Sequence, residues 1–171
     1  MTTCIALRAA VDSDSDLLFE WINDRDLVVF NAPYRPISRP EHEEWFKRIR
    51  KRPDAAFFMI EDRSAGEPVG SCQLINVHPV HRSAELQIRI GVRRSQDQGA
   101  GSEAVRQLVE FGFTQLQLHR IALHVFSTNT RAVRVYEKCG FVREGLLRQA
   151  ACIDGNWVDV ICMAIVRGLD D

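Results

Sequence analysis

The stretch "VRRSQDQGAGSEAVRQLVEFGF" (residues 92–113) decides the fold. The strand-like sequence "ELQIRIGV" leads into it, and apolar residues at helical spacing follow it. Glycine begins helices less well than Ser, Asp or Asn, so Gly99 and Gly101 at the start of a helix indicate that a ligand closely approaches the backbone. The first N–H groups of a helix lack internal partners and lie at the positive end of its dipole. We therefore predict an anion site here, suited to a pyrophosphate.

Outward from this stretch, the chain alternates between helical and strand patterns. Strands are predicted at residues 4–10, 55–62, 67–77, 83–92 and 119–126, followed by a hairpin at 143–166 whose turn is "DG". Helices are predicted at 12–24, at 41–51, from about residue 100, and at 129–140, where Gly140 ends the helix. A single strand–helix–strand unit beside antiparallel strands indicates an α+β fold with a mixed sheet.

Composition indicates one ordinary globular domain spanning residues 1–171. The net charge of -1 gives no sign of a nucleic-acid partner. Five cysteines without a C-x-x-C pattern indicate reduced thiols and no metal site, which is typical of a cytoplasmic protein. The first residues lack a signal pattern, and no stretch reaches the length of a membrane span, so we expect no membrane partner.

Two common phosphate-binding motifs fit these glycines poorly. A P-loop requires a lysine after its second glycine, and none follows Gly101. Residues 99–104 match the dinucleotide pattern G-x-G-x-x-A, but the turn is long and no acid ends the next strand at 119–126.

The segment "QDQGAG" (residues 96–101) matches the Q/R-x-x-G-x-G/A signature of the GCN5-related N-acetyltransferase (GNAT) family. The later segment "STNTRAVRVYEKCGFVREGLLRQ" (residues 127–149) resembles the asparagine, helix, tyrosine and "GF" segment of that family. This resemblance implies a mostly antiparallel seven-stranded sheet flanked by about four helices, with a cleft where the fourth and fifth strands splay apart. It also implies an N-acetyltransferase that uses acetyl-CoA as co-substrate and no metal.

The resemblance assigns two catalytic roles. Tyr136 lies where the family keeps its tyrosine, and a phenol can donate a proton to a departing thiolate. Glu85, on the strand expected beside the thioester, is the candidate base that acts on the amine directly or through water. Glu43, Glu44 and His81 are alternative bases.

The resemblance also implies a cofactor site in which main-chain groups of the fourth strand pair with pantetheine, Gly91 eases a bulge, and the glycine turn holds the phosphates. The expected cofactor-binding residues are Ile88, Ile90, Gly91, Val92, Arg94, Gln96, Gln98, Gly99, Ala100, Gly101, Ser102, Asn129 and Arg131. Arg93 and Arg134 are further candidates for the phosphates of coenzyme A.

For the acceptor, the chain is similar to the spermidine and ribosomal-protein-alanine acetyltransferases. We expect a small primary amine of polyamine or amino-sugar type, walled by Trp21, Tyr34 and Trp45. Asn31 and Ala32 stand where the spermidine enzymes carry an acidic pair, which weakens the case for a polyamine. A protein N-terminal alanine and a non-catalytic acyl-CoA-binding role are the alternatives. A homodimer is a further expectation from the resemblance.

Overall fold

The computed structural model describes residues 4–96 and 99–168 and contains a seven-stranded sheet in the order β1-β2-β3-β4-β5-β7-β6. The strands are β1 (Ile5–Ala9), β2 (Ala56–Asp62), β3 (Glu67–His78), β4 (Ser83–Ile90), β5 (Arg120–Phe126), β6 (Val142–Ile153) and β7 (Asn156–Val166). The helices are α1 (Ser15–Asn23), α2 (Arg25–Val28), α3 (Arg39–Ile49), α4 (Ala100–Thr114) and α5 (Thr130–Lys138), with short 3-10 turns η1 (Asp12–Asp14) and η2 (Arg93–Ser95). The predicted α+β class and mixed, mostly antiparallel seven-stranded sheet are confirmed.

Local sequence explains the element ends. Ser38 caps α3 by accepting a hydrogen bond from the Glu41 N–H, and the bases Lys47 and Arg48 lie in its last turn, where they complement the helix dipole. Asp154 and Gly155 both adopt positive φ, as the turn of the β6–β7 hairpin requires. The short helix α2 was not predicted. Asp24 begins it by accepting a hydrogen bond from the Asp26 N–H.

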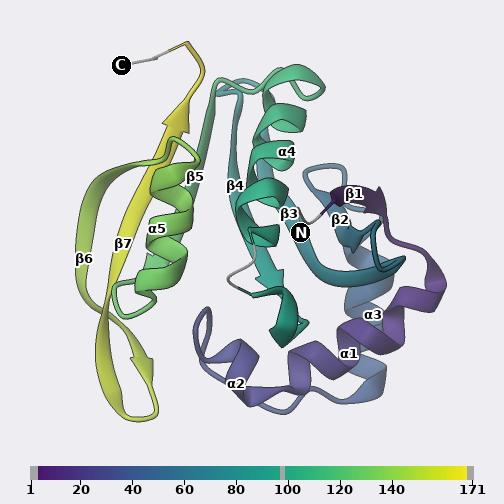
Figure 1. The fold of residues 1–171 in the computed structure, drawn as a ribbon. Helices are drawn as coiled ribbons and strands as arrows, with labels where there is room; N and C mark the ends of the chain where they lie inside the picture. Colours follow the sequence, from purple (N-terminus) through teal and green to yellow (C-terminus); the bar gives the residue numbers. More distant parts are fainter. Residues whose placement is uncertain (1–3, 97–98, 169–171) are drawn as a thin grey trace.

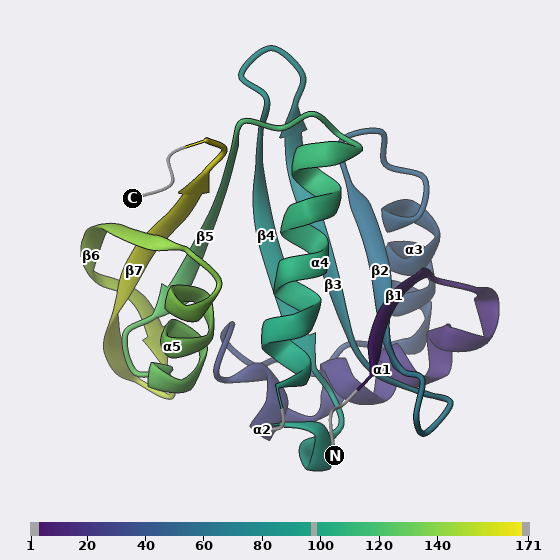
Figure 2. The same ribbon diagram turned by 45° about the horizontal axis from the view of Figure 1, so that its top comes forward.

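The sheet has a parallel pair at its centre. Every neighbouring pair of strands is antiparallel except β4 and β5, which pair only from Ser83–Arg120 to Glu85–Ala122. Beyond Glu85 the two strands separate, and Figure 2 shows β5 diverging from β4 toward the end where α2 lies. This divergence is the predicted splayed cleft.

Helices cover both faces of the sheet (Figures 1 and 2). Helices α4 and α5 lie on one face over the larger apolar core, which includes Leu86, Leu108 and Ile121. Helices α1 and α3 lie on the other face over a smaller core that includes Trp21 and Phe46. None of the helices in the described residues is long and apolar enough to cross a membrane.

Candidate active site

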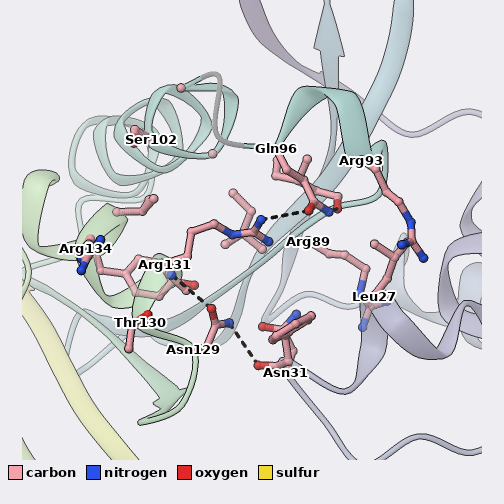
Figure 3. Close-up of a pocket in the computed structure, with 18 of the residues that line it drawn as sticks. Leu27, Asn31, Arg89, Arg93, Gln96, Ser102, Asn129, Thr130, Arg131 and Arg134 are labelled. Carbon is pink, nitrogen blue, oxygen red and sulfur yellow. Dashed lines mark hydrogen bonds between the residues drawn. The ribbon is translucent and has the colours of Figure 1, made fainter.

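A cavity of about 820 Å³ opens beside the glycine turn, between the start of α4 and the start of α5. We call it the α5 cavity. Figure 3 shows its side chains converging from α2, β4, η2, α4 and α5. Cations outnumber acids along it, since Arg93, Arg131, Arg134 and Lys138 face only Asp26. This charge suits a ligand with several phosphates.

The two glycines serve different purposes. Gly99 is the N-cap of α4 with φ of 86°, a left-handed conformation that favours glycine. Gly101 lies inside the first turn of α4, where a Cβ would meet nothing closer than Ile90 Cγ1 at 3.8 Å. Its missing side chain therefore keeps the cavity open above the first amides of the helix.

The edge of β4 that borders the cleft presents main-chain groups. The N–H of Gly91 donates to the carbonyl oxygen of Val69 on the β3 side. Because successive amides of a strand point to opposite sides, the N–H groups of Ile88 and Ile90 point toward the cleft. The expected pairing of a ligand with Ile88 and Ile90 is thus compatible with the backbone.

Gly91 and Val92 are arranged differently from the expectation that they bind cofactor. Their N–H groups donate to the same Val69 carbonyl, at 2.9 and 3.1 Å, which is the hydrogen-bond pattern of a β-bulge. The bulge expected at Gly91 is therefore present, but it turns the Val92 amide toward β3 and away from the cleft.

Two further expected contacts, Arg94 and Ala100, do not line the α5 cavity. Arg94 forms an ion pair with Glu67 instead. Ala100 is fully buried in the core below the helix start. Gln98 lies outside the described residues. Six others from the expected set do line this cavity: Gln96, Gly99, Gly101, Ser102, Asn129 and Arg131.

Gln96 and Asn129 tie the walls of the cavity together. The Gln96 side-chain amide donates to the Ile90 carbonyl (3.1 Å) and its oxygen accepts from Arg131 (3.0 Å) (Figure 3). Asn129 caps α5 through the Ala132 N–H, and its amide donates to the Phe30 carbonyl (3.2 Å). Asn129 is therefore both a helix cap and a brace for the loop after α2.

A second cavity, of about 700 Å³, lies on the opposite face of the sheet beneath α1 and α3. We call it the α3 cavity. The two cavities share four lining residues: Asn31, Ile88, Arg89 and Tyr136. A ligand in one cavity can meet a ligand in the other only between these residues, so they mark the junction where chemistry would take place.

Tyr136 is only 6% exposed and stands at this junction. Burial raises the pKa of its phenol to about 12, so the hydroxyl stays protonated at neutral pH. Among the described residues, no group forms a hydrogen bond with that hydroxyl, which leaves it available to a ligand.

Glu85 lines the α3 cavity where β4 and β5 stop pairing. Its carboxylate accepts a hydrogen bond from Gln87 Nε2 at 3.2 Å. Of the alternative bases, Glu44 lines the same cavity. Glu43 and His81 do not line it. The His81 ring instead stacks on the ring of His78, the last residue of β3.

The three aromatic residues predicted to line the acceptor site occupy different positions. Trp21 and Trp45 line the α3 cavity. Tyr34 lines neither cavity; its hydroxyl donates to the Asn23 carbonyl at 3.2 Å and fastens the loop before α3. Sequence periodicity could not separate these roles, because it does not show whether an aromatic side chain lines a cavity or holds a neighbouring loop in place.

Sequence analysis did not single out Arg89, Gln73 or His124, all of which line the α3 cavity. Arg89 belongs to the polar face of the alternating strand "ELQIRI", a pattern typical of solvated side chains. Its position under α1 and α3 became evident only in the folded chain.

Comparisons with known proteins agree with this geometry. The sequence profile of the acetyltransferase (GNAT) domain matches residues 5–142. The chain is 34% identical over 169 residues to a spermidine N(1)-acetyltransferase of Vibrio cholerae, covering 98% of this chain and 95% of that protein. It is 36% identical over 138 residues to the enzyme of the same name from Escherichia coli K12, covering 81% of this chain and 72% of that one.

A crystal structure of spermidine N-acetyltransferase from Vibrio cholerae, in complex with CoA and spermine, superposes with a TM-score of 0.87. The match covers 95% of each chain at 34% sequence identity.

Proposed function

Because this chain belongs to the GNAT acetyltransferase family, it is an N-acetyltransferase with acetyl-CoA as co-substrate, and we propose that it acetylates a primary amine of a small molecule of the polyamine type. The observation that carries this proposal is the junction at Tyr136, where two cavities of suitable size meet from opposite faces of the sheet. The relatives named for spermidine acetylation support the choice of acceptor class.

The α5 cavity is the proposed cofactor site. Its cations and the open first turn of α4 suit the phosphates, and the Ile88 and Ile90 amides suit the pantetheine arm. Bound acetyl-CoA supplies an acetyl thioester. The Ile88 N–H, which points toward the cleft, is the proposed hydrogen-bond donor that polarises the thioester carbonyl.

The α3 cavity is the proposed acceptor site. A primary amine has an ordinary pKa near 10.4, so it must lose a proton before it attacks. Glu85, directly or through water, is the proposed acceptor of that proton. Glu44 adds a further carboxylate to the same cavity and can hold a distant ammonium group.

Tyr136 is the proposed donor to the departing sulfur. A pKa of about 12 lies above the ordinary thiol value near 8.5, so this phenol is the weaker acid. Tyr136 therefore donates a hydrogen bond to the departing sulfur. As the C–S bond breaks, the phenol proton passes to the sulfur, and the phenol oxygen takes up the second proton that the amine nitrogen loses after Glu85 has accepted the first.

A small acceptor fits better than a protein N-terminus. An open peptide groove would run between the loop at residues 31–38 and the last hairpin, and the ion pair of Arg25 in α2 with Asp154 in the β6–β7 turn links the chain just before that loop to the hairpin.

We also propose a homodimer through β6, the strand at the edge of the sheet. Several large apolar side chains of the β6–β7 hairpin are about half exposed or more: Val142, Leu146, Leu147 and Trp157. Exposed apolar groups at the edge of a sheet favour association. Light scattering on the wild type and on Leu146→Glu tests this; a monomeric wild type contradicts it.

Release of free thiol from acetyl-CoA tests the enzymatic proposal. The panel contains spermidine, putrescine, glucosamine and an alanine-initiated peptide. Turnover with the linear amines supports the proposal, whereas turnover confined to the peptide, or none with any amine, overturns it.

A further inference from the structure

Arg89 occupies a special position in the proposed acceptor site. It is the only cationic side chain among the four junction residues. Along β4, Leu86, Ile88 and Ile90 pack toward the core beneath α4. Side chains alternate along a strand, so Arg89 extends from the opposite face, into the α3 cavity.

The guanidinium of Arg89 has no partner among the described residues. Its Nε is buried without a hydrogen bond, and burial lowers the pKa of the group. Two other cavity arginines differ, since Arg35 pairs with Glu41 and Arg93 pairs with Asp24 and Asp26. A buried cation without a counter-charge is costly, and such groups commonly await a ligand.

The cofactor phosphates do not account for this cation. They are expected beside Gly99, Gly101 and Arg131, at the start of α4. Arg89 reaches the α5 cavity only at the junction, because its side chain leaves β4 on the opposite face of the sheet, where the proposed acceptor cavity lies. The missing anion is therefore expected on the acceptor.

Gln73 provides a matching hydrogen-bond acceptor in the same cavity. The Glu85 carboxylate can only accept, so Gln87 must turn its NH₂ toward Glu85 and its oxygen toward Gln73. Gln73 then donates to that oxygen at 2.8 Å, and its own oxygen remains buried without a partner. The cavity thus presents one cation without a counter-charge, Arg89, and one hydrogen-bond acceptor without a donor, the side-chain oxygen of Gln73.

We propose that Arg89 forms an anion subsite for a carboxylate carried by the acceptor, close to the reacting amine, while Gln73 accepts a hydrogen bond from an N–H of the same molecule. This proposal rests on the proposed function and changes its acceptor, from a bare polyamine to a linear primary amine that carries one carboxylate. The same guanidinium disfavours a protonated amine nearby, which helps to keep the nucleophile neutral.

Matched amines isolate the carboxylate. Ornithine is putrescine with an added carboxylate, and lysine is cadaverine with one. We expect the wild type to show kcat/KM about tenfold or more higher for ornithine than for putrescine, because a charge-assisted hydrogen bond to a buried group is of that size. Arg89→Gln should lower kcat/KM for ornithine about tenfold more than kcat/KM for putrescine, which abolishes the preference, and Arg89→Lys should restore part of it.

Arg48→Gln is the charge-matched control, because Arg48 lines the same cavity but is exposed to solvent. This variant should change kcat/KM for the two amines of a pair by similar factors. A wild type without carboxylate preference overturns the proposal. So does an Arg89→Gln variant that lowers both rates equally, since Arg89 then serves the thioester or the cofactor.

Calorimetry of ornithine and putrescine binding to the CoA complex separates this inference from the enzymatic one. Tighter binding of ornithine that depends on Arg89, without turnover, retains the subsite and overturns the proposed function. Equal binding of the two amines, with turnover of both, overturns the subsite alone.

Discussion

The indole of Trp21 lies directly against the backbone of Gly91, so that a Cβ added at Gly91 would stand 2.2 Å from the ring. Trp21 belongs to α1 and lines the proposed acceptor cavity, whereas Gly91 belongs to the bulge that ends β4. This contact sets how closely the acceptor wall approaches the cofactor strand. Glycine is required here by close approach rather than by a left-handed φ.

Gly91→Ala should therefore destabilise the fold by about 1–3 kcal/mol, because the methyl group forces the buried indole to move. It should also raise the KM for the amine more than the KM for acetyl-CoA. Urea unfolding and steady-state kinetics measure both effects. Gly145→Ala is the control, since a Cβ there meets nothing within 4 Å; equal behaviour of the two variants would contradict the contact.

Substitutions at Gly99 and Gly101 should have different effects on the stability of the fold and on CoA affinity. Gly101→Ala should strengthen α4 by up to about 1 kcal/mol, since alanine favours helix, while Gly101→Leu should fill the open turn and weaken CoA binding at least tenfold. Gly99→Ala should cost about 1–2 kcal/mol in stability through its φ of 86°. CoA titration and thermal unfolding separate the effects. Unchanged CoA affinity in Gly101→Leu rules out the proposed phosphate site.

Tyr136→Phe should lower kcat by roughly 100-fold, the usual size of an acid–base contribution, and leave the KM for acetyl-CoA nearly unchanged. With the phenol pKa raised to about 12, the tyrosine stays protonated through the neutral range. Its ionisation should then cause no loss of rate between pH 7 and pH 10, as measured by thiol release across that range. If the variant turns over like the wild type, Tyr136 is not the donor.

The carboxyl group of Asp14 should make the free energy of unfolding depend on pH. Burial alone would raise the pKa of this carboxyl, but hydrogen bonds from Arg8 and from the Val11 N–H lower it below the ordinary value. A lowered pKa in the folded state stabilises the fold above about pH 4 and loses that contribution as the pH falls further.

Asp14→Asn should thus reduce stability by about 2 kcal/mol at pH 7, and the difference from wild type should shrink toward pH 3. Urea unfolding at both pH values measures it. Asp16→Asn is the matched control, because the Asp16 side chain is 84% exposed and its pair with Arg39 contributes little. A gap between wild type and Asp14→Asn that stays constant with pH would contradict the assignment.

Sequence alone determined the local elements and the family. Period-two alternation predicted β4, and the Asp154–Gly155 pair predicted the last hairpin, because both signals depend on neighbours along the chain. Segments 96–101 and 127–149 carried the glycine turn, Asn129 and Tyr136 together, and they led to the fold and to the N-acetyltransferase class.

Only the tertiary structure decided which polar residues face a ligand. Arg94 and Arg89 are both arginines in or just after β4, yet Arg94 finds Glu67 while Arg89 is left at the junction of two cavities. Tyr34 and Trp45 likewise separate into a loop fastener and a cavity wall. Partners distant in sequence fix these outcomes, because burial and charge pairing depend on which segments the fold brings together.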